Sequence, residues 1–280
     1  MIAVGLGLRR EHYPFLLENR PRVAGWFEAI SENYMDSEGR PMAVLEHVRR
    51  DFPVALHGVS LSIGAVEPPS MLYLQRLRNL TQRIDPFLVS DHFSWGRARA
   101  EYLHDLLPLP FCEESIACVS RNLDIVQEYL GRSIALENVS SYLTYTSSTL
   151  SEWEFISEVV RRSGCRLLLD VNNIYVNAKN HGFSAKTFIE SIPNESVAEI
   201  HIAGHSDRGT HLFDTHSTAV CDDVWNLLRC AVARMPRVPV LLERDEDIPS
   251  FPELEQELER AQTECREAIE QDSILEVTKT

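Results

Sequence analysis

Six apolar segments of the chain each end in a histidine or carboxylate side chain, and these residues are its strongest candidates for chemistry. They are His57, His92, Glu137, Asp170, His201 and Glu243. A short, continuous hydrophobic run is typical of a strand that is buried on both faces. A charged side chain at the end of such a strand is costly to bury unless it is paired or coordinated. The repeated pattern therefore predicts that the six side chains meet at a metal site.

The residue types indicate which metals such a site would hold. Imidazole and carboxylate ligands suit zinc, iron or manganese better than calcium or copper(I). A catalytic ion uses three or four protein ligands, so the six residues suffice for two ions. Asp214 and His216 lie two residues apart and could both face one ion from an extended segment. Together with Asn173, they make room for a third ion.

Each of these residues has an ordinary structural explanation when it is considered alone. A histidine is often a buried, hydrogen-bonded imidazole, Glu137 or Glu243 could pair with an arginine, and Asp170 could cap a turn. Arg244 follows Glu243 directly, but neighbouring side chains of a strand point to opposite sides. Because separate explanations would be needed at six equivalent strand ends, we favour a metal site. Second-shell or substrate contacts suit a further group, which comprises Glu28, Glu32, His104, Asp105, His181 and His205.

Eight apolar runs alternate with helical patterns along the chain. The runs occupy residues 4–8, 26–31, 53–58, 86–92, 133–137, 166–170, 196–202 and 238–243. The helical patterns occupy residues 12–20, 69–84, 113–130, 152–163, 184–191, 222–235 and 251–270, and another begins at Pro41. This alternation predicts an α/β fold, a (β/α)₈ TIM barrel that spans residues 1–270 as a single domain. The carboxyl ends of all strands in such a barrel form one face, where active sites lie.

The remaining segments are predicted to be loops or a tail. Residues 93–111 form a long loop whose apolar content favours an ordered structure, and a loop with three asparagines precedes the helix at 184–191. Residues 203–220 form a polar loop, and residues 271–280 form a flexible C-terminal tail. A doubly wound open sheet is the alternative fold. It would not ordinarily place candidate ligands at the ends of nearly all of eight consecutive parallel strands.

Composition restricts the class of protein. The 280 residues are 44% hydrophobic, which is ample for one sizeable core, and no apolar run approaches the ~20 residues of a membrane span. The first residues do not resemble a secretory signal peptide, so we expect a soluble, cytoplasmic protein that does not bind membranes. The formal charge of −15 gives no general support for nucleic-acid binding. The six cysteines form no C-x-x-C pair, and we expect them to be reduced thiols.

Across residues 2–260, the chain resembles the MbnB- and TglH-like family of multinuclear non-haem iron TIM-barrel enzymes. Members of this family act in the biosynthesis of methanobactin and of cysteine-derived peptide natural products. The matching segments are residues 5–9 (GLGLR), 27–34 (FEAISENY), 57–62 (HGVSLS), 90–92 (SDH), 104–110 (HDLLPLP), 137–140 (ENVS), 170–173 (DVNN), 199–205 (EIHIAGH), 214–216 (DTH) and 243–245 (ERD). No ligand position that the resemblance requires is missing.

The resemblance implies an iron cluster of two or three ions, in mixed Fe(II) and Fe(III) states, at the barrel mouth. The implied ligands are His57, His92 and Glu137 for one iron, Asp170, His201 and Glu243 for a second, and Asn173, Asp214 and His216 for a third. Glu137 would bridge two ions, and Glu137, Asp170 and Asn173 would lie at the reacting centre. The implied reaction uses dioxygen to oxidise cysteines of a ribosomally made precursor peptide. A small partner protein that recognises the leader of the peptide is also implied.

Two other functions use the same ligand types. A divalent-metal barrel of the xylose-isomerase or endonuclease-IV kind would act as a sugar isomerase or a phosphodiesterase, and the predicted barrel is xylose-isomerase-like. The acidic balance weakens the nuclease version. The other hypothesis is a non-enzymatic metal-binding protein or scaffold whose acidic C-terminal segment binds a partner. Residues 244–280 hold 12 acidic and 4 basic side chains, but a solvated helix face explains this excess and is the interpretation that we favour.

Overall fold

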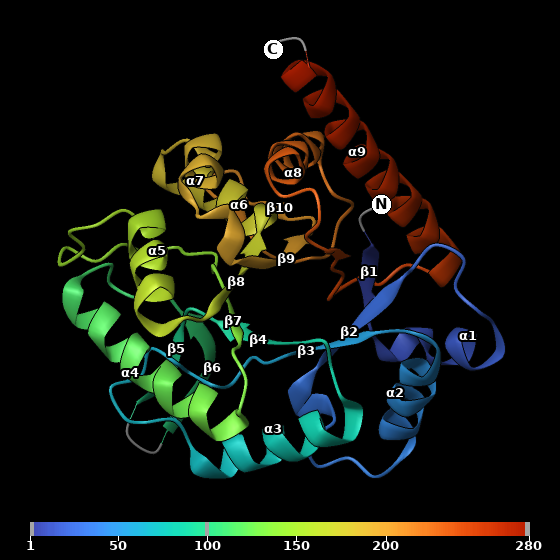
Figure 1. Cartoon of the computed structure of the whole chain (residues 1–280), viewed down its shortest axis with the longest axis horizontal. Helices are drawn as coiled ribbons and strands as arrows, with labels where there is room; N and C mark the ends of the chain where they lie inside the picture. Colours follow the sequence, from blue (N-terminus) through green and yellow to red (C-terminus); the bar gives the residue numbers. More distant parts are fainter. Residues whose placement is uncertain (1–2, 99–100, 278–280) are drawn as a thin grey trace.

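Eight parallel strands close into a barrel, as the alternation of strands and helices predicts (Figure 1). The computed structural model describes residues 3–98 and 101–277. The barrel strands are β1 (Val4–Gly7), β2 (Trp26–Ile30), β3 (Val54–His57), β4 (Leu88–His92), β7 (Ala135–Glu137), β8 (Arg166–Asp170), β9 (Val197–Ile202) and β12 (Val240–Leu242). Neighbours around the barrel follow the order β1-β12-β9-β8-β7-β4-β3-β2. The architecture is therefore the (β/α)₈ TIM barrel, and the doubly wound alternative is excluded.

Helices surround the barrel, each with an apolar stripe that packs on the strands (Figure 1). They are α1 (Tyr13–Glu18), α2 (Arg40–Asp51), α3 (Met71–Ile84), α4 (Glu113–Leu130), α5 (Glu152–Ser163), α6 (Val171–His181), α7 (Ala185–Ser191), α8 (Asp222–Arg234) and α9 (Phe251–Val277), with 3₁₀ turns at Arg10–His12, Ser31–Asn33 and Asn194–Ser196. Ser151 and Glu154 form a capping box at the start of α5. Gly131 and Gly164 end α4 and α5 in the left-handed conformation, so these helices have the predicted ranges 113–130 and 152–163.

The asparagine-rich segment after β8 is the helix α6 and not the predicted loop. This helix begins directly after Asp170, whose Oδ1 accepts a hydrogen bond from the Asn173 N–H at 2.6 Å and caps the first turn. Asparagine has a low helix propensity, but here its side chains find buried partners. The Asn177 amide accepts from the Ser141 N–H at 2.8 Å and donates to the Val139 carbonyl at 2.9 Å. These tertiary hydrogen bonds outweigh the local preference for a loop.

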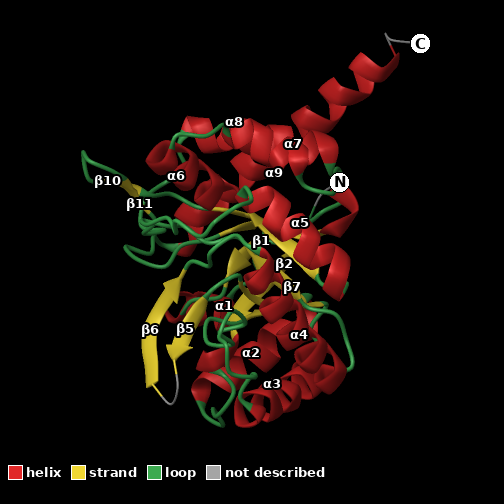
Figure 2. Cartoon of the chain, turned by 90° about the vertical axis from the view of Figure 1, so that its left-hand side faces the viewer, coloured by secondary structure: helices red, strands yellow, loops and turns green. Residues whose placement is uncertain are grey.

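Two segments that the sequence predicts as loops contain short antiparallel hairpins. Residues 93–111 hold β5 (Trp95–Ala98) and β6 (Glu101–Leu107), so this segment is ordered as predicted where the structure describes it. Residues 203–220 hold the two-residue strands β10 (Ser206–Asp207) and β11 (Leu212–Phe213). Figure 2 shows both hairpins on the same side of the barrel.

The last helix, α9, is longer than the sequence predicts. It packs on α8 and β1, and it continues to Val277 instead of ending at residue 270 (Figure 1). The segment predicted as a flexible tail therefore begins inside this helix, and residues 278–280 lie outside the described residues. No helix in the described ranges is long and apolar enough to cross a membrane. All six cysteines are unpaired thiols.

The barrel interior has an apolar layer below the level of the candidate ligands. It consists of Trp26, Ala55, Leu88, Ala135, Leu168 and Leu241. Trp26 fits because Gly5, its neighbour in the adjacent strand, leaves room for the indole. A Cβ added to Gly5 would lie 2.3 Å from the Trp26 ring. This layer closes the barrel beneath the polar side chains, which consequently open towards the carboxyl-end face alone.

We predict that Gly5→Ala destabilises the protein by about 1–3 kcal/mol, because the added methyl group overpacks the Trp26 layer. The measurement is urea unfolding followed by tryptophan fluorescence. Gly25→Ala is the matched control, since a Cβ at that exposed residue would make only ordinary contacts of 3.5 Å or more. The control should change stability by less than about 0.5 kcal/mol. Equal stability of the two variants would contradict the packing argument.

Candidate metal centre

The carboxyl ends of the barrel strands bring together all six side chains that the sequence singles out. His57, His92, Glu137 and Asp170 are the last residues of β3, β4, β7 and β8, His201 is the penultimate residue of β9, and Glu243 directly follows β12. These residues are buried, with exposed fractions between 0% and 8%. So many buried ionisable groups require compensating charge within the cluster.

Three of these side chains converge on one point. His57 Nε2 lies 3.2 Å from Glu137 Oε2 and 3.3 Å from His92 Nε2, and His92 Nε2 lies 3.4 Å from the same Oε2. Ligand atoms that each lie about 2.1 Å from an ion are about 3.0–3.4 Å apart in octahedral or tetrahedral coordination. The triangle therefore fits one ion held by two imidazole nitrogens and one carboxylate oxygen.

Contacts of the outer ring nitrogens determine which nitrogen faces this triangle. His92 Nδ1 lies 3.0 Å from the Gly58 carbonyl, which can only accept, so Nδ1 carries the proton and Nε2 is free to bind a metal. His57 Nδ1 lies 2.8 Å from Ser90 Oγ. Burial lowers the pKa of His92 and favours the neutral imidazole that a metal needs. Burial also disfavours the charged form of His57, but the Glu28 and Glu137 carboxylates outweigh this effect and raise its pKa to about 10.

A second group of ligand atoms shares Glu137 with the first. One atom each of Glu137, Asp170 and His201 lie within 4.8 Å of one another, and His201 Nδ1 lies 3.2 Å from Glu243 Oε2. Burial and the neighbouring Glu137 charge raise the pKa of Asp170 well above its usual value. A cation between the carboxylates would relieve this repulsion. Glu137 thus belongs to both groups of candidate ligands.

A third group forms where the loop after β9 meets the cluster. Ligand atoms of Asp170, His216 and Glu243 lie within 4.8 Å of one another, and His216 Nε2 lies 2.7 Å from Asp214 Oδ1. His216 has a φ of 48°, which is uncommon for a residue other than glycine and is often found at functional sites. The loop therefore brings both Asp214 and His216 to the cluster from outside the barrel strands.

The donor atoms of the cluster fit a group of metal ions. Two buried atoms of the cluster, Asp170 Oδ2 and Asn173 Oδ1, have no hydrogen-bond partner within the described residues. Glu137 Oε2, His201 Nδ1 and His216 Nε2 make no well-directed hydrogen bond there and contact only other candidate ligands, with the nearest contact of each at 2.7–3.2 Å. Buried polar atoms are nearly always satisfied, so these atoms call for an additional partner. Asn173 adjoins the shared carboxylate, because its Nδ2 donates to Glu137 Oε1 at 3.3 Å. Imidazole, carboxylate and amide donors together suit iron, zinc or manganese.

Arg9 supports the outer side of the cluster. Its guanidinium donates to Glu243 Oε1 at 3.1 Å and forms an ion pair with Asp245. The other oxygen of Asp245 lies 3.0 Å from His216 Nδ1. Burial alone would raise the pKa of Glu243. The charges of His216, His201 and Arg9 outweigh burial and hold that pKa well below its usual value. Glu243 therefore remains a carboxylate that faces the cluster with its second oxygen.

Two buried carboxylates, Glu28 of β2 and Glu199 of β9, lie beneath the cluster. Glu199 Oε1 is 3.1 Å and Glu28 Oε1 is 3.5 Å from His201 Nε2, whereas Glu243 contacts the other ring nitrogen. These carboxylates hold a proton on Nε2 and leave Nδ1 facing the metal-type ligands. Glu28 is expected from the sequence, but Glu199 is not at a strand end and carries no predicted role. Its i, i+2 spacing from His201 identifies it, because both side chains then share the interior face of β9.

The other candidates for supporting roles are distributed around the mouth. Glu32 accepts hydrogen bonds from the Val59 N–H at 2.9 Å and the Tyr73 hydroxyl at 2.7 Å. His205 Nδ1 lies 2.8 Å from Asn172 Oδ1, and Asn172 Nδ2 donates to Asp214 Oδ1 at 2.8 Å. The rest are Asp105, which lines the mouth cavity, His181, which contacts Ser141, and His104, whose side chain lies outside the described residues.

The cluster opens into a cavity of about 540 Å³ at the barrel mouth. Its polar floor includes His57, His92, Glu137, His216 and Glu243, and its walls include Val59, Leu106, Tyr142, Leu143 and Phe213. Exposed apolar walls above a polar floor are typical of a site that binds a substrate of mixed character.

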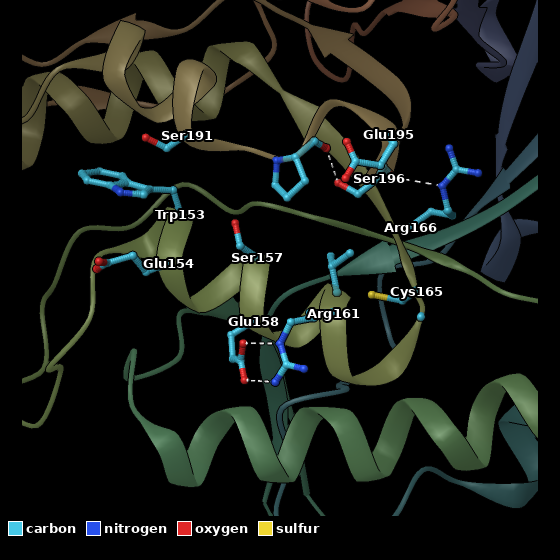
Figure 3. Close-up of a pocket in the computed structure, with 13 residues that line it drawn as sticks. Trp153, Glu154, Ser157, Glu158, Arg161, Cys165, Arg166, Ser191, Glu195 and Ser196 are labelled. Carbon is cyan, nitrogen blue, oxygen red and sulfur yellow. Dashed lines mark hydrogen bonds and ion pairs between the residues drawn. The ribbon is translucent and has the colours of Figure 1, made fainter.

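A larger hollow of about 890 Å³ lies at the opposite end of β8, between α5 and α7 (Figure 3). Its lining includes Trp153, Cys165 and Arg166, and Figure 3 shows the Glu158 carboxylate paired with Arg161. None of the groups of metal-type ligands in the described part of the chain belongs to this hollow. The smaller cavity at the mouth is therefore the candidate active site.

Comparison with solved structures identifies the class of barrel. An L-ribulose 3-epimerase superimposes with a TM-score of 0.64 over 100% of this chain and 98% of its own, at 13% identity. An endonuclease IV from Thermus thermophilus superimposes with a TM-score of 0.58 over 96% of this chain and 99% of its own, also at 13% identity. For a xylose isomerase domain protein from Planctomyces limnophilus, the TM-score is 0.59, and the superposition covers 97% of this chain and 98% of its own at 10% identity. The fold is a xylose-isomerase-like TIM barrel.

Sequence comparison identifies the family within this class. Residues 3–266 match the family of RiPP precursor modification enzymes MbnB/TglH/ChrH, where RiPP denotes a ribosomally synthesised and post-translationally modified peptide. A UPF0276 protein of Anaeromyxobacter sp. (strain Fw109-5) is 49% identical over 93% of this chain and 92% of its own length. A UPF0276 protein of Caulobacter vibrioides is 44% identical over 92% of each. The chain belongs to the MbnB/TglH/ChrH family, as its motifs indicate.

We predict that Glu199→Gln lowers the affinity of the cluster for a divalent metal ion about 10- to 100-fold, because the partner that orients His201 is weakened. The measurement is the content of Fe(II), Zn(II) or Mn(II), each added alone, after equilibration with a competing chelator. Glu195→Gln, an exposed change near the opposite end of β9, is the control and should bind each ion like the wild type. Unchanged metal affinity in Glu199→Gln, at wild-type thermal stability, would show that Glu199 does not position His201.

Proposed function

We propose that this protein is an iron- and dioxygen-dependent oxidase that modifies cysteine residues of a ribosomally synthesised precursor peptide. Membership of a family of RiPP precursor modification enzymes supports a peptide substrate. The observation that carries the proposal is the buried triangle of His57, His92 and Glu137, joined through Glu137 to Asp170 and His201 beneath an open cavity. A ligand-rich centre of this kind can hold more than one redox-active ion.

The proposed ligands follow the three groups of side chains. They are His57, His92 and Glu137 for one iron, Glu137, Asp170, His201 and Glu243 for a second, and Asp170, His216, Glu243, Asp214 and Asn173 for a third. Bound iron would supply redox chemistry with dioxygen and would deprotonate a cysteine thiol that coordinates it.

The protein itself contributes orientation and exclusion of water. Asn173 holds Glu137 through Oε1 and leaves Oε2 facing the two histidines. Arg9 holds Glu243 in the same manner on the opposite side. The apolar side chains of the walls cover the polar floor when a peptide occupies the cavity, which protects a reactive side chain from competing water.

A separate partner for the leader is part of the proposal. A cavity of about 540 Å³ contacts only the few residues around the reacting cysteine. Affinity for the remainder of a precursor then requires another surface, and a small leader-binding protein would provide it.

Sugar isomerisation and phosphodiester hydrolysis are less well supported. The likeness to an epimerase and to endonuclease IV is at 13% identity and concerns the barrel alone. The apolar walls formed by Val59, Tyr142 and Phe213 suit a peptide better than a sugar. The formal charge of −15 opposes binding to a nucleic-acid backbone.

Glu137→Ala should remove at least half of the bound iron and abolish dioxygen consumption with cysteine-containing peptides, because the bridging carboxylate is lost. Iron analysis, Mössbauer spectroscopy and an oxygen electrode measure these effects. Glu114→Ala, on the exposed face of α4, is the matched control and should retain both iron and activity. If Glu137→Ala consumed dioxygen at the wild-type rate, the bridging role would be wrong. A wild-type protein that binds only zinc after iron-replete expression, and is inert with every cysteine peptide, would contradict the oxidase function.

Asp214→Ala should lower the iron stoichiometry by one ion and leave the other ions bound. Asp214 contacts His216, which belongs to the third group alone. The first two groups consist of side chains at the ends of barrel strands. Metal-to-protein ratios under saturating anaerobic iron decide the point, with the exposed Asp124→Ala of α4 as the control. An unchanged ratio would remove Asp214 from the ligand set.

A further inference from the structure

The hairpin beside the mouth has one occupied edge and one free edge. On β5, the N–H groups of Gly96 and Arg97 donate to Ser62 Oγ at 2.9 Å and 3.1 Å, so a side chain occupies this edge. Within residues 3–98 and 101–277, β6 pairs with β5 alone, and its other edge is unpaired. Unpaired edges are templates for an added strand, and proteins usually protect them.

Leu106 presents its backbone at the free edge of β6. The Asp105 carbonyl faces β5, because a Cβ added to Gly96 would lie 2.4 Å from its oxygen. Successive residues of a strand alternate in direction, so the N–H and C=O of Leu106 face away from β5. The Leu106 N–H donates instead to Asp105 Oδ1 at 2.8 Å. A local carboxylate thus covers a donor that an incoming strand could use.

The mouth cavity above the metal-type ligands lies beside Leu106. Its lining includes Asp105, Leu106, Leu107 and Pro108 and no residue of β5. A second cavity of about 210 Å³ also touches Leu106, but it reaches the occupied side of the hairpin, because Ser62 and Gly96 line it. An extended chain on the free side of Leu106 would therefore enter the mouth cavity.

Large apolar side chains are exposed on both sides of this path. On β6, Tyr102 and Leu103 are 44% and 47% exposed. Across the mouth, Tyr142 and Phe213 are 46% and 38% exposed, and their rings stack at a centroid distance of 5.0 Å. The stacked pair Tyr142 and Phe213 lines the mouth cavity, and exposed apolar side chains at a cavity are typical of a surface that a ligand covers.

We propose that the substrate peptide binds in an extended conformation as a third strand on β6, hydrogen-bonded to the Leu106 backbone, with its cysteine over the metal-type ligands. This inference rests on the proposed function and names how that site recognises its substrate. Main-chain hydrogen bonds provide affinity for any extended peptide, and the mouth cavity provides specificity. Apolar residues of the peptide fit against Tyr142 and Phe213.

The test uses the full-length, metal-loaded protein under anaerobic conditions and a library of fluorescein-labelled heptapeptides with a central cysteine. Leu106→Pro removes the N–H, whereas Leu106→Ala removes the same side chain and keeps the N–H. Anisotropy titration with the best library peptide should show binding at least about tenfold weaker to the proline variant than to the alanine variant, at equal metal content. Hydrogen exchange of the Leu106 amide in the wild type should slow at least about tenfold on saturation with the same peptide.

If the proline variant fails to fold, the hydrogen-exchange measurement tests the proposal by itself, because it uses the wild-type protein. Equal affinities of the two variants, or unchanged Leu106 exchange in the saturated wild type, would overturn the assignment to β6. Dioxygen consumption by the wild type with these peptides would leave the oxidase function standing in that case. Binding of no library peptide by the metal-loaded wild type would also overturn the assignment. Absence of dioxygen consumption with every peptide would separately contradict the function.

Discussion

The whole structure depends on the burial of many ionisable side chains at one end of a closed barrel. Hydrogen-bonding water is excluded beneath the cluster by the Trp26 layer, and each carboxylate or imidazole must find its partner among its neighbours. The Arg9 guanidinium contacts Glu243, while burial and the neighbouring Glu137 charge together raise the pKa of Asp170. Positive ions between these side chains would offset the cost of burying them, and metal binding would then be thermodynamically linked to the stability of the fold.

The support of the candidate ligands differs between the barrel and the loop. Candidates at strand ends are fixed by the closed sheet, and their outer atoms are held by fixed acceptors such as the Gly58 carbonyl behind His92. The loop candidate Asp214 depends on longer connections: its N–H donates to the Tyr142 hydroxyl at 2.9 Å, and its carboxylate accepts from Asn172. Tyr142 is also part of the apolar wall of the mouth. The loop therefore couples the outermost ligands to the surface that a substrate would touch.

The sequence predicts the barrel and the candidate ligands at its strand ends because both follow from one repeated pattern, in which an apolar run ends in a polar residue and is followed by a helix. Buried parallel strands are continuous apolar runs, and a polar residue at the end of each run marks the active face. Neighbouring side chains of a strand point to opposite sides, and this alternation correctly predicts that Arg244 points away from the cluster. Arg244 pairs with Glu257 at 2.6 Å. Helix α6 is missed because tertiary hydrogen bonds to its asparagines override a poor local propensity. Glu199 is missed because it lies inside a strand. The adjacent residues in the sequence do not distinguish a carboxylate that supports a ligand from one that forms an ordinary ion pair.

Each carboxylate at the centre of the cluster has one oxygen that is already engaged by the protein. Asp170 Oδ1 caps α6, Glu137 Oε1 accepts from Asn173, and Glu243 Oε1 accepts from Arg9. These hydrogen bonds fix the rotation of each carboxylate and leave its second oxygen for the cluster. The candidate ligands would therefore be oriented before any metal ion arrives, and metal binding would cost little reorganisation of the side chains.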